Sequence, residues 1–329
     1  MRICERALNI FQVSDDEGTV RSCGWMQDRD IGNLIESSVK EIYHGEKMQQ
    51  IRQEFFDNGV SHRCLAGVCP WISNGVLDQH MVEIDEVPEY PEYLLLAYEG
   101  KCNYRCTACF HHQYWERGKD WSHNYDIIEE RLRELLPKTK HLSAHGTAEL
   151  FCSNRILDIL GKWQPESPAN EIHVALETNG SLFDEEHWKK IQNLGKYNVH
   201  VSITVMSFIE KTYQYLSGTK LPIARLEKNL KFVQELREKG EIDFLELATV
   251  MQERNFREMP EFVEKCLSYG ADKVRVRPFF VNGALDRSIE WFSDVRNPYH
   301  PYYHEYKEMI QDPIFPILKC YFGLVLMTA

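Results

Sequence analysis

Apolar and polar residues alternate along residues 93–280 in two regular patterns. Six short apolar runs have the length and continuity of buried parallel strands, at residues 93–100, 141–146, 171–180, 199–205, 244–251 and 273–280. The segments between them show helical periodicity, at residues 125–138, 154–162, 184–195, 224–240 and 258–270. Asp184 stands at an expected helix N-cap, and Gly240 closes the longest of these helices.

Strand and helix therefore alternate six times. This rhythm predicts an α/β fold, a partial (β/α)6 barrel of parallel strands wrapped by helices. In such sheets a ligand lies at the carboxyl ends of the strands. Residues that directly follow a predicted strand are therefore the first candidates for catalytic or ligand-binding residues.

The chain before this region has a different character. Two prolines among acidic residues at 85–92 predict a linker. We expect a small cysteine-rich domain at 1–84, with two short hairpin-like strands, a helix over Val39–Phe56 and a Cys-x4-Cys-Pro loop. The partial barrel then occupies 93–280, and a helical extension occupies 281–329.

Composition and charge narrow the function classes. The net charge of −12 argues against a nucleic-acid surface. No apolar run approaches the roughly 20 residues that span a bilayer, and the first residues lack the features of a signal peptide. We expect a cytoplasmic protein that binds neither nucleic acid nor membrane. Ten cysteines in a reducing compartment favour metal binding or catalysis over disulfides.

Three cysteines follow the first predicted strand in the sequence "KCNYRCTACFHH". Cys102, Cys106 and Cys109 have the spacing C-x3-C-x2-C. Three thiolates can hold three irons of a [4Fe–4S] cluster and leave the fourth iron open, whereas electron-transfer clusters use four cysteines. Two alternatives stay open at this point: a structural zinc site completed by His111 or His112, and three ordinary cysteines.

The sequence "CNYRCTAC" after the first strand of such a fold resembles the radical S-adenosylmethionine (SAM) enzymes. This resemblance implies that Cys102, Cys106 and Cys109 hold a catalytic [4Fe–4S] cluster. In that family the open iron binds the amino and carboxylate groups of SAM. An electron from the cluster cleaves SAM, and the 5′-deoxyadenosyl radical abstracts hydrogen from a substrate.

The resemblance extends over residues 93–280 and implies further SAM-binding residues. In "HGTAEL", Gly146 and Glu149 match a glycine–acid turn that holds the methionine amino group in the family, although Ala148 replaces the second glycine. Glu149 standing alone would be read as a solvated loop acid. In "ETNG", Thr178, Asn179 and Gly180 match a loop near SAM, and an ordinary Asn-Gly turn is the alternative.

Two more positions are implied by the same resemblance. Ser202 matches a polar position facing the SAM ribose or carboxylate, with a strand serine bonded to backbone as the alternative. The family often has an aromatic residue just before the third cysteine, where this chain has Ala108. Phe110, just after that cysteine, is then the candidate for contact with adenine.

The N-terminal segment carries Cys4, Cys23, Cys64 and Cys69 and is similar to the SPASM and Twitch domains of radical SAM enzymes. The similarity implies one auxiliary [4Fe–4S] cluster with four cysteine ligands. A structural Cys4 zinc site is the alternative. The auxiliary segment precedes the barrel, whereas the commoner order is the reverse. The scattered cysteines at 152, 266 and 320 are expected to be core residues.

The resemblance therefore predicts a radical SAM enzyme. The SPASM-like segment favours a peptide or protein substrate, and a small molecule stays open. A reductive donor such as flavodoxin or ferredoxin is expected as a partner. The rival hypotheses are a zinc- or cluster-binding interaction protein and a degenerate family member that no longer cleaves SAM.

Overall fold

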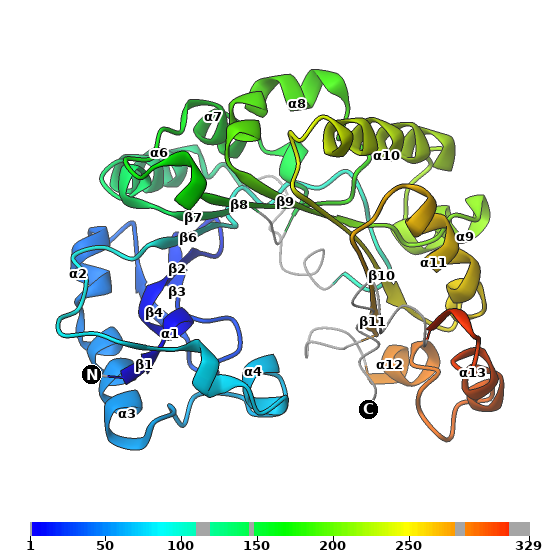
Figure 1. Cartoon of the computed structure of the whole chain (residues 1–329), viewed down its shortest axis with the longest axis horizontal. Coiled ribbons are helices and arrows are strands. Elements are labelled where there is room, and N and C mark those ends of the chain that lie inside the picture. The colour runs from blue at the N-terminus through cyan, green and yellow to red at the C-terminus, as the bar shows by residue number, and fades with distance from the viewer. Residues whose placement is uncertain (1, 110–118, 145–147, 280–286, 316–329) are drawn as a thin grey trace. The chain divides into compact units, whose positions relative to one another are not determined.

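The computed structural model describes residues 2–109, 119–144, 148–279 and 287–315 (Figure 1). The chain forms two compact units. The first comprises residues 1–100, 118–147 and 162–174, and the second comprises 101–117, 148–161 and 175–329. The boundaries of these two units differ from the domain boundaries expected from the sequence, which stay a prediction. None of the helices in the described ranges is long and apolar enough to cross a membrane.

The first unit contains five strands of the main sheet, in the order β4-β3-β2-β6-β7. Their bounds are Ile10–Val13 (β2), Thr19–Arg21 (β3), Asp30–Asn33 (β4), Tyr93–Leu96 (β6) and His141–Ala144 (β7). β2 pairs parallel with β6, and β6 pairs parallel with β7, whereas β3 pairs antiparallel with β2 and β4. The N-terminal segment thus contributes β2 directly beside the first barrel strand, which the sequence reading did not predict.

A separate two-stranded sheet joins β1 (Arg2–Cys4) to β5 (Met81–Glu83). The helices of the first unit are α1 (Glu5–Asn9), α2 (Val39–Tyr43), α3 (Glu46–Asn58), α4 (Pro70–Ser73) and α6 (Ser122–Leu132). The single helix predicted over Val39–Phe56 is wrong: it is broken between α2 and α3. A Cβ at Gly45 would lie 2.7 Å from the carbonyl oxygen of Glu41, so the chain turns where only glycine fits.

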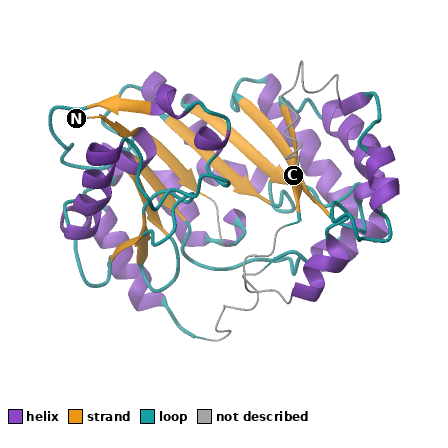
Figure 2. Cartoon of the chain, turned by 90° about the horizontal axis from the view of Figure 1, so that it is seen from below, coloured by secondary structure: helices purple, strands orange, loops and turns teal. Residues whose placement is uncertain are grey.

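The second unit contains β8 (His173–Thr178, from Ala175 on), β9 (Asn198–Thr204), β10 (Phe244–Met251) and β11 (Lys273–Pro278) in chain order. β10 pairs parallel with both β9 and β11. Figure 2 shows the strands side by side, with helices packed along them. The helices are α7 (Asn154–Lys162), α8 (Glu185–Ile191), α9 (Glu210–Ser217), α10 (Ile223–Glu238), α11 (Met259–Ser268), α12 (Arg287–Ser293) and α13 (Tyr303–Met309).

All six predicted strands are confirmed, five of them with an earlier carboxyl end than predicted, and so is the α/β class with mostly parallel strands. The expected N-cap is also confirmed, because the Asp184 side chain accepts a hydrogen bond from the His187 N–H at 3.1 Å. The sequence reading missed α9. That helix has eight residues, and Leu216 is its one aliphatic side chain, so it contains no apolar run that marks a helix of ordinary length.

The strands of the second unit have two different faces. Val199, Val201 and Ile203 of β9 are buried, and Ile203 lies near Leu226 of α10 on the side that the helices cover. Figure 1 shows α8, α10 and α11 on one side of β9–β11. The alternate positions form what we call the polar face: Ser202, Thr204, Glu246, Lys273, Arg275 and Arg277.

Candidate functional site

The cysteine triplet lies in the second unit, on the loop after β6, and its thiols influence one another. Burial raises the pKa of Cys102 to about 12, although the N–H of Tyr104, 3.4 Å from Cys102 Sγ, acts against it. Burial also raises the pKa of Cys106, and the thiols of Cys102 and Cys109 raise it further. Neighbouring thiols thus contribute to the raised pKa of both Cys102 and Cys106, and such a group of sulfur donors suits a cation.

Helix α9 holds this loop in place. The N–H groups of Arg105 and Thr107 each donate to α9 carbonyls, those of Ser217 and Leu216, both at 2.9 Å. Gly218 ends the helix with φ +59°, and a Cβ there would overlap the carbonyl oxygen of Arg105. Only glycine suits both the positive φ and this close approach. In the sequence, Gly218 after "YQYLS" was the one sign that a helix ends here and contacts the cysteine loop.

Glu149 lies at the centre of a second group. Its carboxylate is buried, with 1 % of the residue exposed. Oε1 accepts hydrogen bonds from the Thr178 hydroxyl and, at 3.2 Å, from the Phe151 N–H. Oε2 accepts from the Asn179 N–H at 2.6 Å. Burial raises the pKa of Glu149, and these three donors oppose the rise.

The structure brings this group to the cysteine triplet. The Asn179 side chain donates to Asn103 Oδ1 at 2.9 Å, and Asn103 in turn donates to Ser181 Oγ at 2.8 Å. The Glu149 N–H donates to the carbonyl of Lys101 at 2.9 Å. The carboxylate is close enough to raise the pKa of Cys102 and Cys106. The predicted residues Glu149, Thr178 and Asn179 therefore converge on the triplet, together with Asn103 and Ser181, which the sequence reading missed.

The remaining predicted residues divide into three cases. Gly180 has φ +73°, and a Cβ there would lie 2.7 Å from Ile203 Cγ2 and 2.8 Å from Leu226 Cδ1, so packing requires glycine. Ser202 donates to Glu246 Oε1 at 3.0 Å, on the polar face rather than in the Glu149 group. Gly146, Phe110, His111 and His112 lie outside the described residues.

The four N-terminal cysteines lie in the first unit and line one small cavity together with Trp25 and Trp71. Burial, and to a smaller extent the neighbouring thiols, raise the pKa of Cys4 to about 11 and that of Cys64 to about 12. Backbone N–H groups of Ala7 and Arg6, at the start of α1, act on Cys4 in the opposite direction. Four thiols on one cavity, with N–H donors at the sulfur, fit a four-cysteine iron–sulfur ligand set.

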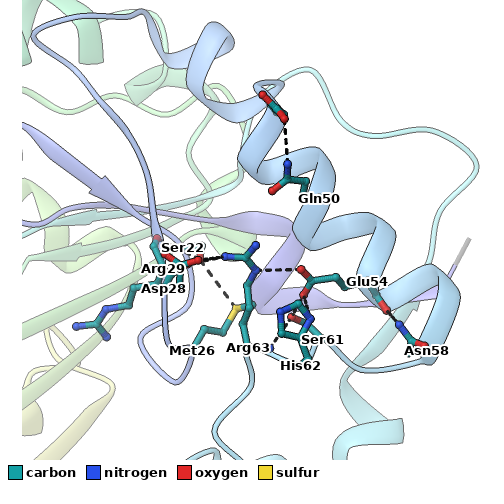
Figure 3. A network of polar contacts seen from close by, with 11 residues as sticks. Ser22, Met26, Asp28, Arg29, Gln50, Glu54, Asn58, Ser61, His62 and Arg63 are labelled. Carbon is teal, nitrogen blue, oxygen red and sulfur yellow. Dashed lines mark hydrogen bonds and ion pairs between the residues drawn. The ribbon is translucent and has the colours of Figure 1, made fainter.

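A network of polar and ionic contacts, part-buried at Glu54 and exposed at Asp28, holds the segment that carries Cys64 (Figure 3). Arg63 donates from Nε to Glu54 Oε1 of α3 at 3.0 Å and from Nη1 to Asp28 Oδ2 at 2.6 Å. The Ser61 hydroxyl also contacts the Glu54 carboxylate. Met26 and Cys64 form a β-bridge. These contacts tie the Cys64 segment to α3 and to the turn after Cys23, and none was predicted.

Arg6 brings a positive charge to the same cavity. Its guanidinium lies 4.2 Å from the ring centroid of Trp25 and 5.3 Å from that of Trp71. Burial raises the pKa of Cys23, whereas the Trp25 N–H and the Arg6 charge lower it. Among the described residues, no group of three or more His, Cys, Asp or Glu side chains is arranged around a single ion position.

Comparison with protein families identifies the class of this protein. The radical SAM superfamily model matches residues 100–266, just over half of the chain. The model of SPASM, an iron–sulfur cluster-binding domain, matches residues 4–70. The chain belongs to the radical SAM superfamily and is an enzyme of that class, with SAM and [4Fe–4S] clusters as its cofactors. The SPASM domain precedes the radical SAM domain, as predicted.

Individual relatives are more distant. The chain is 27 % identical over 188 residues to the tungsten-containing aldehyde ferredoxin oxidoreductase cofactor-modifying protein of Pyrococcus furiosus. The match covers 56 % of this chain and 51 % of that protein, so the chain matches about half the length of this relative. SuiB of Streptococcus suis has 14 % identity and a TM-score of 0.48, covering 96 % of this chain and 70 % of SuiB. anSMEcpe, solved with SAM and a peptide, has 17 % identity and a TM-score of 0.40, covering 57 % and 50 %.

Proposed function

We propose that this protein cleaves SAM reductively at a [4Fe–4S] cluster held by Cys102, Cys106 and Cys109, and that the 5′-deoxyadenosyl radical abstracts hydrogen from a substrate. The observation that carries this proposal is the convergence of Glu149, Thr178 and Asn179 on the triplet loop. The cluster supplies the electron and leaves one iron for SAM. The protein's part is to hold SAM and keep water away.

Glu149 is the residue we assign to the SAM amino group. The Thr178 hydroxyl and the Asn179 N–H fix the orientation of its carboxylate. Each carboxylate oxygen has two acceptor sites, so Oε2 retains one for an ammonium donor. A carboxylate with 1 % exposure is shielded from water, which strengthens such a charge-assisted bond. Gly146, Gly180, Ser202 and Phe110 remain further proposed SAM contacts.

Cys4, Cys23, Cys64 and Cys69 are proposed to hold an auxiliary [4Fe–4S] cluster. Their shared cavity and the N–H groups near Cys4 support this assignment. We further propose a peptide or protein substrate, a proposal that the SPASM-like segment favours and that the match to the SPASM domain supports. A flavodoxin or ferredoxin is the proposed electron donor. Modification of a small molecule or cofactor is the second candidate, since the Pyrococcus relative is named as a cofactor-modifying protein.

The first experiment is anaerobic purification, reconstitution with iron and sulfide, and assay of iron content and 5′-deoxyadenosine. The variants are the triple Cys102, Cys106, Cys109→Ala protein and, as a matched control, Cys266→Ala, whose thiol is buried in the core. We expect about eight irons in the wild type and about four in the triple variant, with 5′-deoxyadenosine formed by the wild type and the control.

Two results would contradict the proposal. Bound zinc in place of iron, without SAM cleavage, would indicate a metal-stabilised interaction protein. A full set of irons without SAM cleavage, even with reductant and peptide present, would indicate a degenerate member of the family.

A further inference from the structure

Two buried N–H donors on β11 and at the end of β10 have no hydrogen-bond partner among the described residues: Gln252 Nε2 and Arg275 Nε. Gln252 directly follows β10 and is 4 % exposed. Its Oε1 accepts from the hydroxyl of Thr107, in the cysteine triplet loop, at 3.3 Å. Buried donors in native proteins nearly always have a partner. An unpaired donor beside the triplet loop therefore indicates a ligand that accepts hydrogen bonds.

The strand register connects Gln252 to the polar face. Glu246 stands opposite Ser202 and Lys273, Ala248 opposite Thr204 and Arg275, and Val250 opposite Arg277. Successive layers are separated by two residues, roughly 7 Å along a strand. Gln252 comes two residues after Val250. Arg277 is thus about one layer, roughly 7 Å along the strand direction, from Gln252, which contacts the triplet loop.

Positive charge exceeds negative charge on this face of β9–β11. The Glu246 carboxylate, with 5 % of its side chain exposed, lies 3.0 Å from Lys273 Nζ and 2.5 Å from Arg275 Nη2. Burial acts to raise the pKa of Glu246, but Arg275 and Lys273 outweigh it and hold that pKa below its usual value. One carboxylate thus faces two cations.

Arg277 adds a third cation. Within the described ranges it has no ion pair, hydrogen bond or ring contact, and it occupies the same face as Arg275. A free guanidinium presents five donors in a planar fork, which fits a carboxylate. At the carboxyl end of β11, it lies where ligands of parallel sheets bind.

We propose that the β10–β11 part of the polar face, towards the carboxyl ends of these strands, is a subsite for a carboxylate group of the substrate, bound by Arg277 and Gln252 with Arg275 behind them. The substrate class is then an acidic one, such as a peptide with Asp or Glu near the modified position. This inference rests on the proposed function, since it assigns a substrate group to the same site. The ion pairs of Glu246 hold Arg275 in place, so Arg277 is the cation free to bind.

The test is chemical footprinting of the reconstituted protein with the arginine reagent phenylglyoxal, read residue by residue by mass spectrometry. The probes are glutarate, its neutral analogue glutaramide, inorganic phosphate and SAM, each at millimolar concentration. We expect glutarate to slow modification of Arg277 several-fold and glutaramide to leave it unchanged. Arg133, whose side chain is 75 % exposed, serves as the internal control and should react equally throughout. In Gln252→Met the protection by glutarate should be weaker.

Equal protection by glutaramide, or none by glutarate, would overturn the proposal. Protection by phosphate but not by glutarate would overturn the assignment to a carboxylate. Full protection by SAM alone would show that these donors bind the cofactor instead. SAM cleavage is measured on the same preparation. Absence of SAM cleavage would contradict the proposed function, whereas absence of protection at Arg277 would contradict only the proposed subsite.

Discussion

The carboxylate of Glu149 accepts a hydrogen bond from the backbone N–H of Asn179, at 2.6 Å. Glu149 comes after β7 and Asn179 comes after β8, so this contact joins two segments at the carboxyl ends of strands. A buried carboxylate is costly unless donors surround it. The donors found here fix the acid beside the cysteine triplet, where the proposed mechanism requires a group that binds the SAM amino nitrogen.

The Thr178 hydroxyl is one of those donors, and its loss should lower both the free energy of unfolding and the rate of SAM cleavage. Thr178→Val leaves Oε1 of the buried carboxylate short of a donor, and we expect a loss of about 1–3 kcal/mol in unfolding free energy. Urea denaturation measures this loss, and 5′-deoxyadenosine formation should fall with it. Thr139→Val, which removes a buried hydrogen bond from a threonine hydroxyl to the Leu135 carbonyl, is the matched control. An equal effect of both substitutions on SAM cleavage would contradict the role given to Thr178.

Gly218 should be required to hold the loop that carries Cys102, Cys106 and Cys109. Gly218→Ala places a methyl group against the carbonyl oxygen of Arg105, so the loop with the triplet has to move. We expect iron content to fall by up to about four atoms, because one cluster is no longer held. Gly240→Ala is the control, since Gly240 also has positive φ, +76°, but nothing lies within 4 Å of its Cβ position. Backbone strain alone, roughly 1–2 kcal/mol, would affect both variants.

His141 should make the unfolding free energy depend on pH. Burial and the neighbouring His173 lower its pKa from 6.5 to about 4. The unfolded chain then binds more protons between these values, so the stabilisation is complete above pH 6.5 and is lost as the pH falls towards 4. Because His141 is only half-buried and solvent weakens the effect, the loss should reach about 1–2 kcal/mol. His141→Phe keeps a ring between Tyr93 and His173 and should remove this dependence, whereas His123→Phe, at an exposed position, should not.

Arg63 should be needed to hold Cys64. Arg63→Met leaves Glu54, whose side chain is 15 % exposed, without its arginine partner, while the imidazole of His62 stays 3.2 Å from the carboxylate. Loss of one partner of a fully buried ion pair costs about 3 kcal/mol or more, so loss of this part-buried pair should cost less, about 1–2 kcal/mol. We expect poorer iron retention in the Cys102, Cys106, Cys109→Ala background, where only the auxiliary site remains. Arg133→Met removes an exposed ion pair and should retain iron fully. Unchanged retention in both variants would rule out this role for Arg63.

Arg6 should raise the reduction potential of the auxiliary cluster. Reduction adds negative charge, and a cation held near the cysteines by Trp25 and Trp71 stabilises the reduced state. In the same triple-alanine background, Arg6→Gln should lower the midpoint potential in a titration followed by electron paramagnetic resonance. Arg6→Lys keeps the charge and should stay close to the parent. A potential that does not respond to either substitution would exclude the electrostatic effect.

The sequence by itself determined the alternation of strands and helices, because the periodicity of apolar residues is a local property. It also placed Cys102, Cys106 and Cys109 after a strand. Through the family resemblance it indicated Glu149, Thr178 and Asn179 as candidates for SAM binding. It failed at the break between α2 and α3, where a Cβ at Gly45 would lie 2.7 Å from the carbonyl oxygen of Glu41, a close approach that the sequence does not show.

Only the tertiary structure decided which distant residues meet. The support of Arg105 by Gly218, the bond between Glu149 and Asn179, and the pairing of β2 with β6 all join segments far apart in the chain. The unpaired donors of Gln252 and Arg275 are likewise invisible in the sequence, since a donor is unpaired only by virtue of what surrounds it. Local patterns specify elements, whereas register and packing, which arise on folding, bring their side chains together into a site.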